Sequence, residues 1–351
     1  MGTRWALEPI HFNATTNRSL PDPDRLIPRF VAAVIHEFPP ILNCWYLTGA
    51  TASGKSGISR MLAGALNAEI VSMDSMAVYR GMDIGTAKPT NDELAEVPHH
   101  LIDVIDPNEE FSLAEFLTLS HQAVAAIHQR GKQVLFVGGT PLYLKSLLRG
   151  VCEGPPANED FRREVEKEVE SVGVEALRQR LEQVDPLSAA KLHPNDKRRM
   201  IRALEVYTLT GTPISHYQLQ FEGKHSDRCK RVFVVSRKRD ELHTRINERT
   251  EKMFESGLVE EVKALQAKHG TFSKTSLQGV GYSESLNHLE EKCDIAEAVE
   301  LTKIRTRRFA RRQETWFRGL DECQWLPVDA KTSKSQLVDL ILSPQEKQEL
   351  E

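Results

Sequence analysis

The sequence predicts an α/β fold, a parallel sheet flanked by helices, with an all-helical insertion domain. Three observations lead to this prediction. Short apolar runs alternate with helical patterns over residues 41–155 and 225–326, which is typical of a parallel sheet covered by helices. Residues 156–224, between these segments, show helical patterns only. Residues 49–56 match the pattern G-x-x-x-x-G-K-[ST] of phosphate-binding loops, so the sheet is expected to be P-loop NTPase-like.

The phosphate-binding loop (P-loop) stands between a predicted buried strand, Ile41 to Leu47, and a predicted helix, Gly57 to Leu66. The motif requires this strand–loop–helix setting, in which backbone N–H groups of the loop and of the helix N-terminus face an anion. Lys55 is expected to reach the outer phosphates, and the Ser56 hydroxyl is expected to bind Mg²⁺. The predicted phosphate-binding residues are Gly49, Ala50, Thr51, Ala52, Ser53, Gly54, Lys55 and Ser56.

Asp74 follows the next predicted strand, residues 69–72. A carboxylate at the carboxyl end of a strand in an α/β sheet faces the crevice where ligands bind. Asp74 is therefore a candidate general base or metal ligand. A turn or helix-capping role is the commoner use of an aspartate at such a position and stays open on the residues alone. Residues 78–89, polar and glycine-containing, predict a long functional loop near the site.

A short strand and a turn are predicted at residues 98–107. His99 and His100 are interpreted as polar loop residues rather than metal ligands, because neither has a partner at metal-ligand spacing. Ser112 and Glu115 form a capping box that begins a helix from Leu113 to about His128, and Gly131 ends it.

A second anion-binding corner is predicted where the strand at residues 133–137 runs into Gly138, Gly139 and Thr140. Pro141 then begins another helix. Two glycines and a hydroxyl at the carboxyl end of a strand suit a phosphate. A simple tight turn explains the glycines equally well, so Thr140 is a candidate phosphate ligand and no more on this reasoning.

The helical insertion carries a basic patch at residues 195–202, at the start of a helix. Such a patch binds a polyanion or forms a solvated face, and the residues favour neither.

After the insertion, residues 231–236 predict a strand that rejoins the sheet. One long helix is predicted from Asp240 through Ala267. Arg237, Arg245 and Arg249 make this region cationic near the end of the strand, where a phosphate would lie.

The end of the chain is predicted to hold an interrupted helix start at residues 277–282, a basic helix at 303–318 and a polar, peripheral tail at 327–351. The basic helix has seven basic residues against one acidic residue, with Phe309, Trp316 and Phe317 interleaved. Cations bind phosphates and rings stack on unpaired bases, so this composition favours contact with RNA. An amphipathic helix with its aromatic residues packed inward is the alternative.

Composition sets further limits. A net charge of −4 argues against a uniformly basic nucleic-acid binder, although local basic patches remain. No apolar run approaches the roughly eighteen residues of a membrane span. The five cysteines are scattered and predict reduced thiols in a cytoplasmic protein. Residues 1–40, with six prolines, are predicted to be a flexible extension.

The residues alone thus indicate a P-loop enzyme, for which a small-molecule kinase is the default interpretation. Two features fit a kinase poorly. The basic helix implies a large polyanionic partner. In addition, no hydrophobic strand clearly ends in the acid that P-loop NTPases use to hold Mg²⁺.

Taken together, the motifs resemble the tRNA dimethylallyltransferases, also called tRNA isopentenyltransferases, of the bacterial type. The resemblance spans roughly residues 41–326 and is most specific over residues 74–89. It also rests on the motifs at residues 49–56, 98–103, 138–143, 193–206, 281–282 and 308–316. Ala77 stands where many members have Gln, and Ser56 where many have Thr.

The resemblance implies transfer of a dimethylallyl group from dimethylallyl diphosphate to N6 of adenosine 37 in the tRNA anticodon loop. Asp74 becomes the expected general base. Lys55, a Ser56-bound Mg²⁺, Thr140 and Arg245 are expected to stabilise the departing diphosphate. The residues expected at the tRNA are Asp74, Ser75, Met76, Ala77, Lys197, Arg198, Arg199, Met200, Ile201, Arg202, Arg308, Arg311 and Arg312.

We expect a monomer with no membrane partner. Two alternatives remain: an adenylate isopentenyltransferase acting on free adenine nucleotides, and a P-loop small-molecule kinase. The first needs neither the helical insertion nor the basic helix, and both are present here.

Overall fold

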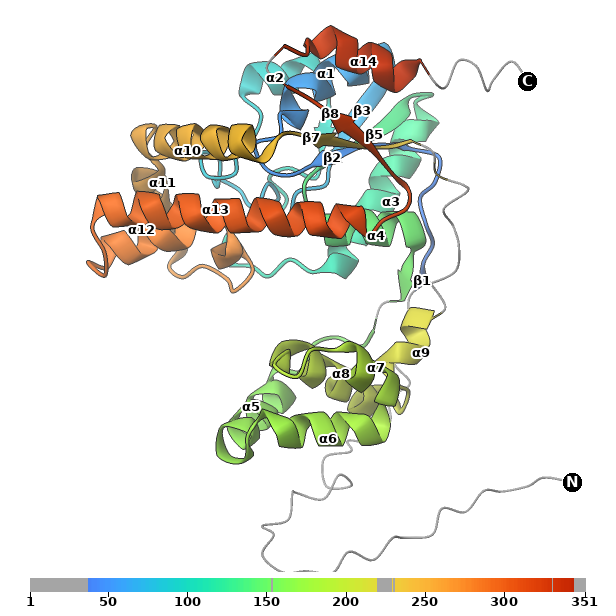
Figure 1. Cartoon of the computed structure of the whole chain (residues 1–351), viewed down its shortest axis with the longest axis vertical. Helices are drawn as coiled ribbons and strands as arrows, with labels where there is room; N and C mark the ends of the chain where they lie inside the picture. The colour runs from blue at the N-terminus through green and yellow to red at the C-terminus, as the bar shows by residue number, and fades with distance from the viewer. Residues whose placement is uncertain (1–36, 153, 220–228, 230, 330, 344–351) are drawn as a thin grey trace, which may run out of the picture. The chain divides into compact units, whose positions relative to one another are not determined.

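The structure is a computed structural model that describes residues 37–152, 154–219, 229, 231–329 and 331–343 (Figure 1). The chain divides into two compact units. One is helical and contains residues 154–218. The other is an α/β unit formed by the described parts of residues 37–153 and 219–351. The predicted flexibility of residues 1–36 lies outside the described residues. Residues 37–40 were expected in the same extension, but Glu37–Phe38 form strand β1, which pairs with β6, Val151–Cys152, of the α/β unit.

The α/β unit is built on a six-stranded parallel sheet. Parallel strands are covered on both faces, which explains their almost continuous apolar runs. The P-loop, Asp74 and Gly138 all lie at the edge where the strands end. In spatial order the strands are β4, His99–His100; β3, Ala68–Ser72; β5, Gln133–Gly138; β2, Trp45–Gly49; β7, Val232–Ser236; and β8, Cys323–Pro327.

Two strands differ from the prediction. β2 begins at Trp45 rather than at Ile41. Ile41 is buried but lies outside the ladder, and its N–H donates to the Leu147 carbonyl at 2.7 Å. β8 was not predicted, because this edge strand has only one buried residue, Leu326, and shows no continuous apolar run.

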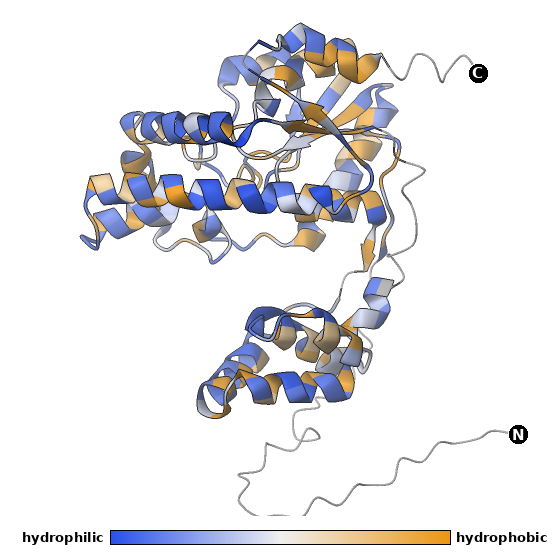
Figure 2. Ribbon diagram, viewed as in Figure 1, coloured by the Kyte–Doolittle hydropathy of each residue, from blue (hydrophilic) through white to orange (hydrophobic). Residues whose placement is uncertain are grey.

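Helices lie on both sides of the sheet (Figure 1), with hydrophobic stretches coloured orange in Figure 2, and alternate strand residues pack into two different cores. Trp45 and Leu47 pack with helices α1, Lys55–Ala65, and α14, Lys334–Leu342. Tyr46 packs in the larger core on the opposite face. The helices that contribute to that larger core include α3, Leu113–Gln129; α4, Pro141–Arg149; α11, Leu258–His269; α12, Tyr282–Leu289; and α13, Ile295–Arg318.

The prediction of a polar, peripheral tail at residues 327–351 is wrong for helix α14. Leu337, Val338 and Ile341 are buried in the same cluster as Leu62 of α1. The segment is mostly polar, but its few apolar residues recur at helical spacing and form one buried face.

The single helix predicted from Asp240 through Ala267 is two helices, α10, Arg239–Glu255, and α11. The break falls at Gly257, whose φ of 95° is left-handed and ends a right-handed helix at low cost only for glycine. The interrupted helix start is confirmed: a 3₁₀ turn, Ser276–Gln278, precedes α12.

Other local features agree with the sequence analysis. The capping box of Ser112 and Glu115 is present at the start of α3. Residues 78–89 form turns rather than a helix, with one bridge from Tyr79 to Ile105. A short helix, α2, Asn91–Glu96, follows this loop. None of the described helices combines the length and the apolar character needed to cross a bilayer.

The helical unit contains α5, Glu159–Val172; α6, Val174–Val184; α7, Pro186–Lys191; α8, Lys197–Thr210; and most of α9, Ile214–Leu219. Phe161, Val165 and Leu181 lie in its core. Buried Glu205 accepts hydrogen bonds from Arg162 and Arg202. A buried carboxylate needs such partners, so this pair of arginines serves the fold of the unit.

Candidate active site

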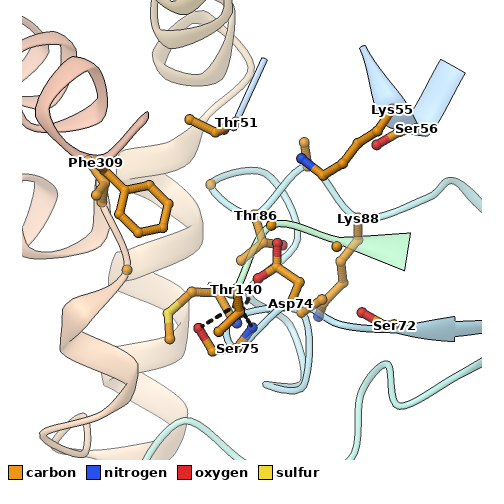
Figure 3. A pocket seen from close by; sticks show the side chains of 18 of the residues that line it. Thr51, Lys55, Ser56, Ser72, Asp74, Ser75, Thr86, Lys88, Thr140 and Phe309 are labelled. Atoms are coloured by element: carbon orange, nitrogen blue, oxygen red, sulfur yellow. Dashed lines mark hydrogen bonds between the residues drawn. The ribbon is translucent and has the colours of Figure 1, made fainter. Parts of the chain in front are cut away.

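A cavity of about 730 Å³ in the α/β unit lies at the carboxyl edge of the sheet. Its walls come from the P-loop, the end of β3, the loop at residues 85–89, the corner at residues 138–140, and helices α10, α12 and α13. Figure 3 shows Asp74, Ser75 and Thr140 together in this pocket, with Lys55 and Ser56 to one side and Phe309 to the other. A second, more open cavity shares Lys55 and Ser56 with the first.

The P-loop has the backbone shape that its glycines were expected to allow. Gly49 and Gly54 have φ values of 148° and 103°. A Cβ atom at Gly49 would lie 2.5 Å from the Val235 carbonyl oxygen, so no other residue fits there. Lys55 Nζ donates to the Ala50 carbonyl at 3.3 Å and stays inside the loop.

Burial lowers the pKa of Lys55 to about 8, while Asp74 acts to raise it and Arg249 acts to lower it. A lysine that has lost part of its solvation regains a favourable charge interaction when an anion binds beside it. The pocket therefore places a desolvated cation where a phosphate would sit.

Asp74 is half-buried, and its Oδ1 accepts the Met76 N–H at 2.9 Å. The carboxylate belongs to the pocket wall, as the position after β3 predicted. Thr140 lies beside it: its Oγ1 accepts the Ser75 N–H at 3.1 Å and lies 3.4 Å from the Ser75 hydroxyl oxygen (Figure 3). The two predicted site residues are thus brought together by direct contacts of their segments.

The corner at Gly138 is tightly packed against the segment of Asp74. A Cβ atom at Gly138 would lie 2.0 Å from the Met73 carbonyl oxygen, and the Thr140 N–H donates to that same oxygen at 3.3 Å. Glycine is required here by close approach of two backbones, which is a reason that the sequence pattern did not reveal.

Gln313 of α13 is a site residue that sequence reasoning missed. Its Oε1 accepts the Thr51 N–H at 2.9 Å, and its Nε2 donates to the Gly139 carbonyl. Its residue type did not indicate a site role, because an amide is neither a cation that binds phosphate nor a ring that stacks on a base. Its position could have indicated burial: Gln313 lies one helical turn from Phe317, on the buried side of α13.

The three arginines near the P-loop differ in position. Arg237 donates to the Ser53 carbonyl at 2.7 Å and is paired with Glu241. Arg245 is exposed and donates to the Ala52 carbonyl at 2.9 Å, on the side of the second cavity. Arg249 lines both cavities; burial lowers its pKa and Asp74 acts to raise it. Arg249 is therefore the arginine that faces the pocket of Asp74.

The basic residues of α13 lie partly on the pocket. Arg308 and Arg312 are exposed side chains that line it, together with Phe309. Arg311 is exposed but lies outside the pocket lining. Of the other two rings, Phe317 is fully buried and Trp316 is 39% exposed, so one ring packs inward, and contact of this helix with RNA stays a prediction.

The residues of the helical unit that were predicted to contact RNA differ in exposure. Arg198 and Arg199 are exposed and Lys197 is half-buried. Met200 and Ile201 are buried in the core of the unit, so the structure does not support their contact with RNA. Met200 and Ile201 come directly after the basic residues in the chain but lie on the side of α8 that faces the core. Arg202 is held by Glu205 and the Pro155 carbonyl.

The described residues contain no cluster of three or more His, Cys, Asp and Glu side chains that could hold a metal ion. His100 Nε2 instead lies 2.7 Å from Glu69, and His99 Nδ1 lies 2.7 Å from the Val97 carbonyl oxygen. The exposed Ser56 hydroxyl at the pocket fits Mg²⁺ bound mainly by substrate phosphates and water, because Mg²⁺ commonly takes only one or two protein ligands in such sites.

A parallel sheet whose strand β2 leads into a P-loop, facing a carboxylate at the end of β3, defines a P-loop enzyme that handles a phosphorylated substrate. The family model described as IPP transferase matches residues 77–320. The chain belongs to this family.

Relatives and solved structures agree with this assignment. The chain is 52% identical to the tRNA dimethylallyltransferase of Rhodopirellula baltica, over 80% of this chain and 86% of that protein. It is 44% identical to the tRNA dimethylallyltransferase of Geobacter sulfurreducens, over 81% and 91%.

Two solved structures share the fold. The full-length tRNA isopentenylpyrophosphate transferase of Bacillus halodurans is 39% identical, with a TM-score of 0.59 over 87% of this chain and 98% of that one. A eukaryotic dimethylallyltransferase acting on tRNA is 28% identical, with a TM-score of 0.70 over 86% and 77%.

Proposed function

We propose that the protein transfers a dimethylallyl group from dimethylallyl diphosphate to N6 of adenosine 37 in the anticodon loop of tRNA and releases diphosphate. One observation carries the proposal: a P-loop and the carboxylate of Asp74 share a single pocket, and the exposed Arg308 and Arg312 line that same pocket. The pocket thus joins a place for a phosphate, a proton acceptor and a basic surface.

The diphosphate of the donor occupies the P-loop, where backbone N–H groups and Lys55 neutralise it. Negative charge grows on the diphosphate as it leaves, so Lys55, Thr140 and Arg249 stabilise the transition state more than the ground state. Arg245 completes this set from the second cavity. The Ser56 hydroxyl would hold Mg²⁺ together with the diphosphate, and a bound Mg²⁺ would supply further neutralisation of the leaving group's charge.

Asp74 acts as the general base. The exocyclic amine of adenine is a poor nucleophile, because its lone pair is delocalised into the ring. The carbon–oxygen bond to diphosphate breaks while the carbon–N6 bond forms. The N6 proton passes to the Asp74 carboxylate, and the diphosphate leaves with the electron pair of the broken bond.

The RNA is held from α13 and from the helical unit. A base stacked in the anticodon loop cannot reach the end of β3, so adenosine 37 enters the pocket as an extruded nucleotide. Arg308 and Arg312 bind the phosphates on either side of it, and Arg198 and Arg199 of the helical unit bind the stem. The protein works as a monomer in the cytoplasm.

One assay tests the proposal against its alternatives. The protein is incubated with labelled dimethylallyl diphosphate and either unmodified tRNA or AMP. We expect label in tRNA only. Label in AMP would identify an adenylate isopentenyltransferase, and consumption of the ATP γ-phosphate without alkylation of tRNA would identify a kinase.

A further inference from the structure

The side chain of Gln313 joins the two backbone corners that face the pocket. Its Oε1 accepts the N–H of Thr51 in the P-loop at 2.9 Å. Its Nε2 donates to the carbonyl of Gly139, in the turn between β5 and α4. The side-chain amide therefore makes one hydrogen bond to each corner, and the residue is only 3% exposed.

The surroundings leave little room for another arrangement. A Cβ atom at Gly139 would lie 2.7 Å from Gln313 Nε2, 3.3 Å from the Gly49 carbonyl oxygen and 3.4 Å from Lys55 Nζ. The bridging amide, both corners and the Lys55 ammonium thus share one small volume. A buried amide with both ends paired holds a single geometry, because loss of either partner leaves a buried polar group unsatisfied.

We propose that Gln313 is a positioning residue that sets the distance between the P-loop and the corner at residues 138–140. It does so through these two backbone hydrogen bonds, from a buried position in the pocket wall. The spacing it sets determines where Lys55 and Thr140 stand relative to the two phosphates. This inference rests on the proposed function, in which a diphosphate occupies the P-loop.

The helix that carries Gln313 gives the bridge a second consequence. Arg312 precedes Gln313 in the chain, and Arg308 lies about one turn before Arg312 in α13. Both arginines line the pocket. The bridge therefore sets the donor loop relative to this helix, so its loss should also lower kcat, while Arg308 and Arg312 remain exposed to bind tRNA. A shift of one ångström between reacting groups is enough to cost a large factor in rate.

The test is Gln313→Met, which removes both hydrogen bonds at nearly unchanged volume. We expect the KM for dimethylallyl diphosphate and the inhibition constant of inorganic diphosphate to rise about tenfold. The KM for tRNA should stay within about twofold. Gln122→Met, the same change at an exposed position of α3 outside the pocket, is the matched control and should leave all three values unchanged.

A second variant disturbs the hydrogen bond between Gln313 and Gly139 by changing Gly139. Gly139→Ala places a methyl group against Gln313 Nε2 and should raise the inhibition constant of inorganic diphosphate in the same way. Thermal unfolding without ligand shows whether each variant folds. If Gln313→Met does not fold, Gly139→Ala replaces it in the test. An inhibition constant within twofold of the original in a folded variant overturns the inference. An equal rise in the KM for both substrates also overturns it.

Lys55→Ala separates this inference from the proposed function. If Lys55→Ala still binds inorganic diphosphate normally, the proposed donor site itself is wrong. If Lys55→Ala loses this binding while the folded Gln313 and Gly139 variants keep it, the donor site stands and the bridging role of Gln313 is rejected.

Discussion

At the scale of single residues, the pocket combines one carboxylate with two partly desolvated cations. Burial lowers the pKa of both Lys55 and Arg249, and Asp74 is the group that opposes this effect at each of them. The three side chains therefore act as one electrostatic unit. Catalysis by such a unit depends on charges that are already oriented before the substrate arrives.

Asp74→Asn should lower turnover by about 10²–10⁴-fold with little loss of tRNA affinity. Asparagine keeps an oxygen that accepts the Met76 N–H, so the loop keeps its shape, but it cannot take a proton from N6. Single-turnover rates and tRNA binding measured side by side check this. Near-normal turnover would remove Asp74 from the mechanism.

Lys55 should make diphosphate binding sensitive to alkaline pH. With its pKa lowered to about 8, the free enzyme holds the charged ammonium below pH 8 and loses it as the pH rises above that value. One unit above the pKa only about a tenth of the lysines are charged, so the contribution of this cation to affinity should fall by up to about tenfold.

Calorimetric titration of inorganic diphosphate at pH 7 and pH 9 measures this loss. Lys55→Arg, which stays charged throughout, is the control that also corrects for titration of the ligand. Equal pH dependence in the two proteins would show that Lys55 does not titrate in this range.

At the scale of elements, α14 shows that a largely polar terminal segment belongs to the core. Three of its residues, Leu337, Val338 and Ile341, pack in the cluster that also holds Leu62 of the P-loop helix. Because α1 begins inside the P-loop motif, α14 supports the element that carries the phosphate site.

Ile341→Ala should destabilise the protein by about 2–4 kcal/mol, because Ile341 is fully buried and its truncation leaves a cavity. Leu340→Ala, at the neighbouring position that is 50% exposed, should change stability by less than about 0.5 kcal/mol. Urea unfolding of both variants measures the difference. Equal stabilities would mean that α14 does not pack against α1 through Ile341.

At the scale of the whole molecule, the positive charge that we propose binds RNA is confined to one surface. The chain is acidic overall, with a net charge of −4, while the exposed arginines of α13 gather at the pocket. A negative protein with a basic stripe attracts RNA to one surface and repels it elsewhere.

Replacing both Arg308 and Arg312 by Ala should weaken tRNA binding and reduce its salt dependence by about one unit of slope for each phosphate that is no longer neutralised. Lys268→Ala, an exposed lysine at the end of α11 outside the pocket, is the matched control and should leave the slope unchanged. Binding measured over a range of salt concentrations gives the slopes. An unchanged slope in the double variant would place the RNA elsewhere.

Local sequence patterns were sufficient to predict much of the fold and several residues of the candidate site. The P-loop, the aspartate at the end of β3, the helical insertion and the positions of most strands along the chain follow from motif spacing and from hydrophobic periodicity, because each depends on residues close together in the chain. The resemblance to the tRNA dimethylallyltransferases rested on the same local motifs, and the chain belongs to the IPP transferase family.

Packing between distant segments decided the rest. Gln313 meets Thr51 across 262 positions of sequence, Arg249 rather than Arg245 faces the pocket of Asp74, and Ile341 packs against the P-loop helix. No local pattern encodes such pairings, since each depends on how whole elements pack in space. The sequence by itself determined which chemical groups the protein has at its site; the tertiary structure determined which of them stand together, because burial and distance are properties of the packed chain.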